Sequence, residues 1–119
     1  MVTISASNFK NLFNEADFEE EHAEEIIDLA IDILNLYSDA DLPNMTGTAG
    51  SKTVSLESKE KGAVFVVARA IYWGFYKGPQ ATAIQGQSLS PADVMGNSAV
   101  IQSVREAARM LAELDVSYG

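Results

Sequence analysis

The stretch GAVFVVARAIYWGFY, residues 62–76, constrains the fold of this chain most, because it carries a single charge, Arg69. All its other residues are small, aliphatic or aromatic. It is shorter than the roughly 18 uninterrupted apolar residues of a membrane helix, and an arginine near its centre costs about 2.5–3.5 kcal/mol on insertion scales. A membrane span is therefore disfavoured, and we expect either a central helix or a surface that another protein covers.

The apolar pattern predicts one helix over residues 57–77, which Gly78-Pro79 ends. A helix that is apolar on most of its circumference is normally central in a bundle. Either the whole helix belongs to the core, or one face packs in the core while another contacts a neighbouring subunit. The second interpretation makes the aromatic side chains of this helix interface candidates, because such rings are frequent at interfaces. They are Tyr72, Trp73 and Tyr76. Arg69 is expected to pair with Asp28 or Asp32, or to lie at the rim.

Two amphipathic helices, 19–37 and 98–115, are predicted to cover the central one, and a short helix over 8–13 precedes them. The buried stripe predicted for the first of these consists of Phe18, His22, Ile26, Leu29, Ile33 and Leu36. The predicted helix caps are Ser5 or Ser7, Asp17, Ser55 or Ser58, and Ser98.

The connections between these helices are expected to be long. We expect flexible loops over about 43–56 and 78–97 and a short C-terminal tail over 115–119. Within the loops, the sequence allows a very short extended piece at 53–56 and a turn near 91–95. The predicted fold is therefore an all-α single domain over 1–119, a small bundle of three main helices plus a short N-terminal helix, with two long loops.

Nearly all the net charge of -9 lies in the first third of the chain. Residues 1–42 hold eleven acids and one base, a net charge of -10, whereas residues 43–119 hold a net charge of +1. Such a pole repels DNA phosphate and favours a basic partner or solubility at high salt, or is simply a solvated helix face. In the last helix, Arg105 and Arg109 share a face and are interface candidates. Otherwise they are solvated or paired with neighbouring acids.

Residues that carry chemistry are sparse. The chain has no cysteine, which excludes disulfides and thiol catalysis, and its one histidine, His22, is expected to pack half-buried rather than to bind metal. The stretch GTAGSK, residues 47–52, lacks the spacing of a phosphate-binding loop. The carboxylates lie along one helix face rather than in a cleft. We therefore predict no catalytic residue, no cofactor and no metal, and a protein that is not an enzyme.

Four segments resemble the small helical head–tail connector (adaptor) proteins of long-tailed double-stranded DNA phages and related archaeal viruses. They are ISASNFKNLFNEAD, EEEHAEEIIDLAIDILNLY, ARAIYWGFY and the amphipathic final helix. In that family, a short first helix with an F-x-x-x-F pair, here Phe9 and Phe13, precedes a long acidic helix. The resemblance spans most of the chain as a pattern of spacing.

The resemblance implies a structural virion protein located in the neck, at the head–tail junction, and assembled in the host cytoplasm. It implies a ring of twelve copies beneath the portal protein, which extends the DNA channel and docks the next neck or tail protein. Genome DNA would pass nearby without specific binding, and no membrane is involved. It also implies that the C-terminal segment reaches toward the portal, which adds Leu114, Val116 and Tyr118 to the interface candidates.

A different class also fits the acidic helix. A stand-alone acidic binding module, either a regulator or an inhibitor that mimics DNA, would place its carboxylates at phosphate-like spacing along helix 19–37.

Overall fold

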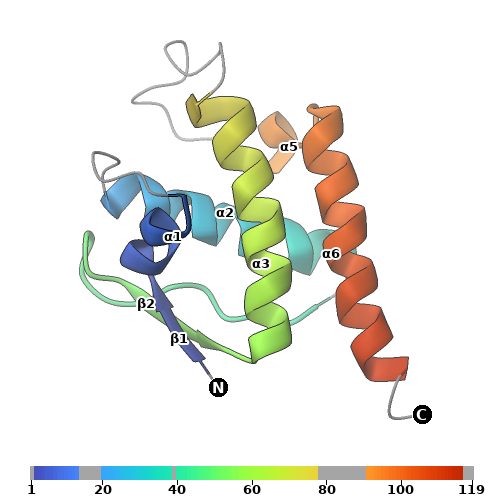
Figure 1. The fold of residues 1–119 in the computed structure, drawn as a ribbon, viewed down its shortest axis with the longest axis horizontal. Helices are drawn as coiled ribbons and strands as arrows, with labels where there is room; N and C mark the ends of the chain where they lie inside the picture. Colours follow the sequence, from blue (N-terminus) through green and yellow to red (C-terminus); the bar gives the residue numbers. More distant parts are fainter. Residues whose placement is uncertain (1, 14–19, 39, 78–90, 117–119) are drawn as a thin grey trace.

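The computed structural model describes residues 2–13, 20–38, 40–77 and 91–116. They form a mostly helical fold with a small two-stranded sheet (Figure 1). In chain order, the elements are β1 (Val2–Ser5), α1 (Ala6–Phe13), α2 (Glu20–Ser38), β2 (Thr53–Leu56), α3 (Ser58–Ile71), the π-helical turn η1 (Tyr72–Lys77), α5 (Pro91–Val94) and α6 (Ser98–Val116).

The two-stranded sheet corrects the prediction of a purely all-α fold. Strand β1 pairs antiparallel with β2, in a register that runs from Val2 opposite Leu56 to Ser5 opposite Thr53. Along β2 the side chains alternate, so that Val54 and Leu56 are buried while Thr53 and Ser55 are exposed. The extended piece predicted at 53–56 is confirmed. Its partner β1 was not predicted, because Val2–Ser5 becomes a strand only by pairing with β2, which lies some fifty residues later in the chain.

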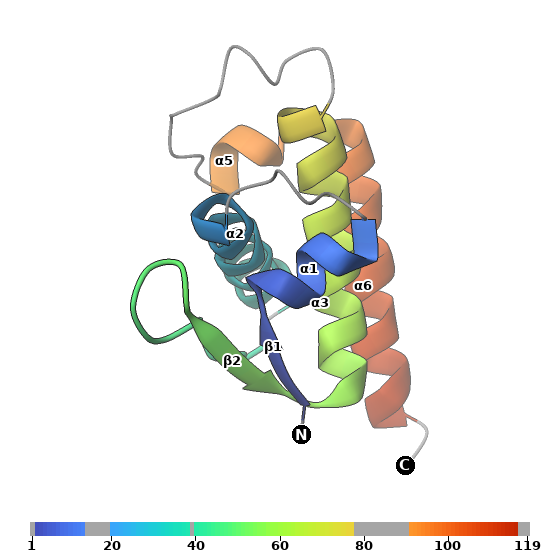
Figure 2. The same cartoon turned by 60° about the vertical axis from the view of Figure 1, so that its left-hand side comes forward.

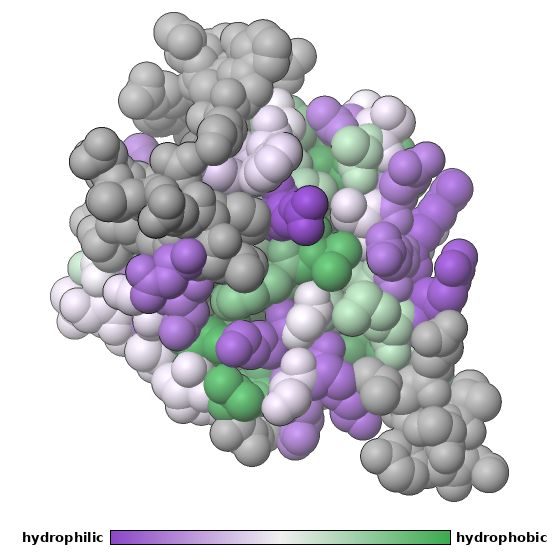
Figure 3. Space-filling model, in the orientation of Figure 1, coloured by the Kyte–Doolittle hydropathy of each residue, from purple (hydrophilic) through white to green (hydrophobic). Residues whose placement is uncertain are grey.

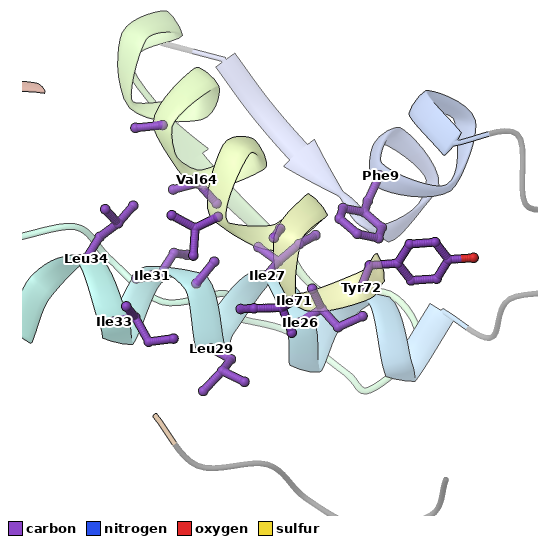
Figure 4. Close-up of a cluster of buried hydrophobic side chains, with 14 of the residues drawn as sticks. Phe9, Ile26, Ile27, Leu29, Ile31, Ile33, Leu34, Val64, Ile71 and Tyr72 are labelled. Atoms are coloured by element: carbon purple, nitrogen blue, oxygen red, sulfur yellow. The ribbon is translucent and has the colours of Figure 1, made fainter. Parts of the chain in front are cut away.

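The core lies between α2 and α3. Val64 and Ile71 of α3 face Ile27 and Ile31 of α2 (Figure 4), and all four are fully buried. This burial confirms that the apolar stretch supplies a central helix. The predicted helix over 57–77 changes its hydrogen bonding after Ile71, where the π-helical turn η1 continues it.

The short helix α1 closes one end of this core. Phe9 is buried and meets the rings of Phe65 and Tyr72 edge-on, with centroids 6.1 Å and 5.9 Å away. Edge-to-face pairs of this kind add about 0.5–1.5 kcal/mol beyond the area that they bury. Phe9 therefore joins the N-terminal segment to α3.

Helices α3 and α6 run antiparallel and lie side by side, with α2 packed across one face of the pair (Figures 1 and 2). Two glycines mark close approaches at the two ends of this pair. A Cβ added at Gly62 would lie 3.5 Å from Met110 Cε, and one added at Gly74 would lie 3.2 Å from Asn97 Nδ2. Small residues thus allow the two helices to pack closely over their length.

Leu36 corrects the buried stripe that was predicted for α2. Ile26, Leu29 and Ile33 are buried as expected, but Leu36 is 76% exposed. Leu36 falls in the last turn of α2, which ends at Ser38. After the helix, the Asn35 side chain donates to the Leu42 carbonyl (3.0 Å) and accepts from its N–H (2.9 Å). Leu42 is thereby buried against the bundle, while Leu36 stays outside. His22 is half-buried, as expected.

The helix caps differ from the predicted ones at two of three described ends. Asn97, and not Ser98, caps α6, since its Oδ1 accepts from the N–H of Ala99 (2.9 Å) and of Val100 (3.3 Å). Glu57 caps α3 through a reciprocal capping box with Glu60. At α1, Ser5 precedes the helix as predicted, but the bond runs in the reverse sense: its N–H donates to Asn8 Oδ1 at 2.8 Å, and its Oγ donates to the same oxygen at 3.2 Å.

Some predictions fall on residues that the structure does not describe. These include the Asp17 cap, the Phe18 member of the stripe, most of the loop over 78–97, and the end of the tail. The part of that loop that is described contains α5, where a turn was predicted. In the described part of the chain, no helix has the length and apolarity that would let it cross a membrane.

Candidate functional site: a groove between α3 and α6

The outward face of α3 is the most unusual surface of the described residues. At 100° per residue, Gly62, Val66 and Arg69 lie within about 60° of one another, roughly opposite Val67 and Ile71, which face the core. A face in this position would normally be polar. Here the side chains beside Arg69 are apolar or small, so α3 presents apolar surface on both sides.

This outward face and α6 enclose a groove with a volume of about 600 Å³. Its small lining residues are Gly62, Ala70, Gly74, Ala99 and Ser103, and its larger ones are Phe65, Val66, Arg69, Trp73, Asn97 and Glu106. Figure 3 shows this face, with apolar and small residues between the two helices and hydrophilic side chains along the outer side of α6. The many small side chains of the lining leave room for a side chain from another molecule.

Two cations lie over aromatic rings beside the groove. The Arg69 guanidinium is 5.6 Å from the centroid of the Trp73 ring, and Lys61 Nζ is 5.8 Å from that of Phe65. Arg69 is exposed, so of the two predicted environments it has the one at the rim. Cation–π contacts contribute about 0.5–1 kcal/mol at exposed sites. They hold Arg69 and Trp73 together as one amphipathic surface.

The acids of α2 accept hydrogen bonds from the loop over 43–56. Glu24 is only 3% exposed, and its Oε1 and Oε2 accept the N–H groups of Gly50 and Lys52, both at 2.8 Å. A carboxylate that accepts two backbone donors is well satisfied without a cation. The predicted loop over 43–56 is therefore hydrogen-bonded to α2 through its own backbone.

Two further carboxylates bind the start of the same loop. Asp28 Oδ1 accepts the Met45 N–H at 2.8 Å, and Asp32 Oδ1 accepts from Asn44 Nδ2 at 3.0 Å. Met45 is buried beneath them. Glu24, Asp28 and Asp32 thus position the loop. Asp28 and Asp32, the two acids predicted as partners of Arg69, bind Met45 and Asn44 instead.

The predicted interface residues are spread over several surfaces. Trp73 lines the groove and is 53% exposed, whereas Tyr72 is only 4% exposed and packs on Phe9. Arg105 and Arg109 are exposed on α6. The side chains of Tyr76, Leu114 and Val116, and all of Tyr118, lie outside what the structure describes.

Sequence reasoning missed two exposed apolar side chains at the end of α2. Leu36 is 76% and Tyr37 is 47% exposed, and with Trp73 they are the large hydrophobic residues that the described part of the chain leaves in solvent. Periodicity alone places Leu36 inside. The sequence did contain one indication of their exposure. Both residues fall within the last turn of the helix, which ends at Ser38, and other elements no longer cover a helix beyond its end.

The described residues hold no group of three or more His, Cys, Asp or Glu side chains placed to bind a metal ion. Comparisons with protein-family models, curated proteins and solved structures found no match to this chain. What the geometry offers is a concave apolar surface with a cationic and aromatic rim, which is suited to binding another protein.

Proposed function

We propose that this protein is a structural component of a tailed-virus particle, a head–tail connector of the neck. Twelve copies would form a ring beneath the portal protein, extend the DNA channel and dock the next neck or tail protein. The observation that carries the proposal is the uncovered groove between α3 and α6, which supports a subunit that works in contact with others. The family resemblance of the sequence supplies the kind of assembly.

The groove supports a subunit role because it is built on the central helix. The groove is lined mainly by apolar and small side chains with a few polar ones, a composition that is common in binding sites. Trp73 at its rim is the residue type most enriched among interface hot spots, and Arg69 is another such type. A helix that packs inward on one face and outward on the other suits a ring, in which every subunit has two neighbours.

The charge distribution also supports a location beside DNA. With a net charge of -10 over residues 1–42, the α2 side of the protein repels phosphate and would let DNA slide past without gripping it. This part of the proposal concerns passage of DNA, and no base or phosphate recognition is involved.

A DNA-mimic inhibitor is less well supported by the same helix. A mimic needs a row of free carboxylates at the surface, but Glu24 is buried and Asp28 binds the backbone of the loop over 44–52. Asp32 also contacts that loop, through Asn44. Among the acids of α2 whose side chains the structure describes, Glu25 is the one that neither is buried nor binds this loop, so they do not form a row of free carboxylates.

Antibody labelling of purified virus particles tests the proposed location. Gold-labelled antibody raised against this chain should mark the neck between head and tail, and should mark neither the capsid shell nor the tail tip. Particles without neck label, together with strongly salt-dependent binding of the chain to a DNA-binding protein, would contradict the connector and favour the inhibitor.

A further inference from the structure

We propose that Leu36 and Tyr37 of one copy dock into the α3–α6 groove of the next copy. This contact between two different surfaces would be repeated around the ring. It rests on the proposed function, since it names the surfaces through which the connector subunits meet. We call Leu36 and Tyr37 the α2 knob.

The α2 knob and the groove carry the exposed large hydrophobic side chains of the described residues. These side chains are Leu36, Tyr37 and Trp73, and the first two adjoin in sequence on the last turn of α2. A projecting leucine and tyrosine on one surface and a concave apolar surface on another have complementary shapes. Docking one in the other removes all three side chains from water at once.

Leu36 of the knob and the groove point away from each other, as a chain of subunits requires, while Tyr37 lies about 100° round α2 from Leu36. Ile27 of α2 faces α3 (Figure 4), and Leu36, nine residues further on, lies about 180° round the helix from it. The groove lies on the side of α3 that faces away from α2. A subunit can therefore offer its knob to one neighbour and its groove to the other, which is the heterologous type of contact that builds a ring when the rotation between subunits closes.

Charge complements shape at these two surfaces. The knob adjoins the acidic face of α2, where Glu25 and Asp32 are exposed, and α2 contains no lysine or arginine. The groove contains Arg69, and Lys61 Nζ lies over the ring of Phe65, which also lines it. Among the described residues, Glu106 is the acid that lines the groove, while Arg105 and Arg109 are exposed on the outer side of α6. Opposite charges on facing surfaces favour this pairing and steer its encounter.

The same charges disfavour symmetric pairs. A groove-to-groove dimer would bring the Arg69 side chains of two copies together, and a knob-to-knob dimer would bring two acidic α2 faces together. Like charges that face each other across an interface weaken binding, so the charge distribution disfavours both symmetric pairings. The head-to-tail contact satisfies shape and charge together.

The absence of cysteine from the chain permits a direct test by cross-linking. Three single variants are needed, Leu36→Cys on the knob, Ser103→Cys in the groove and Ser55→Cys as a control on the exposed side of β2. They are mixed in pairs, alone and with portal protein, and treated with a short bifunctional thiol reagent. Sedimentation of the same samples records whether the copies associate.

The proposal predicts a cross-linked dimer when the Leu36→Cys and Ser103→Cys variants are mixed. It predicts a ladder of higher oligomers when both substitutions are placed in one chain, and no dimer from any mixture with Ser55→Cys. Each single variant alone should stay uncross-linked, because like surfaces do not meet.

Three results would overturn the contact. Dimers of Leu36→Cys or Ser103→Cys alone would show a symmetric pair. If sedimentation shows association but no mixed dimer forms, the copies meet through other surfaces, as when the portal or the chain's own C-terminal segment occupies the groove. That result would overturn the contact and leave the proposed connector function standing. No association in any sample, portal included, would overturn the proposed function and the contact with it.

Discussion

At the scale of single residues, Leu34 and Leu36 have the same chemistry but opposite environments. Leu34 of α2 is fully buried in the core, whereas Leu36 of the same helix is 76% exposed. Leu36 lies on the same side of α2 as the buried Leu29, but it falls in the last turn of the helix, which ends at Ser38. The cost of truncation is therefore expected to differ greatly between the two positions.

We predict that Leu34→Ala lowers the free energy of unfolding by about 2–5 kcal/mol, since it leaves a cavity in a packed core. Leu36→Ala should change it by less than about 0.5 kcal/mol, as at other exposed positions. Urea denaturation of the two variants and the parent chain makes the comparison. Equal losses at both positions would show that Leu36 is part of the core after all.

Glu24 is the residue whose burial is hardest to foresee and easiest to test. Glu24→Ala removes the acceptor of the Gly50 and Lys52 N–H groups, and an unsatisfied buried donor costs about 1–3 kcal/mol. The neighbouring Glu25 is exposed, so Glu25→Ala is the matched control and should be nearly neutral.

Hydrogen exchange of backbone amides localises the effect of Glu24→Ala. Faster exchange is expected at Gly50 and Lys52, with little change at the amides of α6. Unchanged protection at both loop amides would mean that the carboxylate does not anchor the loop.

At the scale of elements, the start of α6 depends on one side chain. The Asn97 Oδ1 accepts two N–H groups of the first turn, while Ser98 already lies inside the helix and is exposed. We predict that Asn97→Ala costs about 1 kcal/mol of stability, a typical value for a lost N-cap, and that Ser98→Ala costs much less. Thermal or urea unfolding of the two variants measures both. The reverse order would restore Ser98 as the cap.

Most helices of this fold were predictable because their signal is local. The apolar period of α2, α3 and α6 lies within each segment, and the bounds of all three differ from prediction by only a few residues. Strand β1 was not predictable in this way, since Val2–Ser5 becomes a strand only by pairing with β2 some fifty residues later. Burial of Glu24 likewise depends on backbone donors from a distant loop.

The groove was predictable in part. Arg69 stood out in the sequence because it is the single charge in an apolar stretch. Trp73 stood out because the aromatic side chains of this helix exceed what a small core needs to bury. The α2 knob did not stand out in the sequence, because Leu36 and Tyr37 continue an ordinary amphipathic pattern. They are exposed because the end of α2 extends beyond the elements that pack on it. A surface formed where an element ends is a property of the assembled fold.

At the scale of the whole molecule, an acidic side and an open apolar groove oppose each other across the α2–α3 pair. We predict that the isolated chain is monomeric or weakly associating, because each contact buries few side chains, and that the portal organises the copies into a ring. Sedimentation of the chain over a range of concentrations measures this. A stable ring in isolation would show contacts larger than the knob and groove provide.

Electron microscopy of the chain mixed with the portal protein of the same virus tests the central claim most directly. A connector predicts a symmetric ring of this chain, coaxial with the portal and beneath it, with twelve copies in contact head to tail. Portal particles that carry no added ring, at concentrations of the chain far above those of the portal, would contradict it.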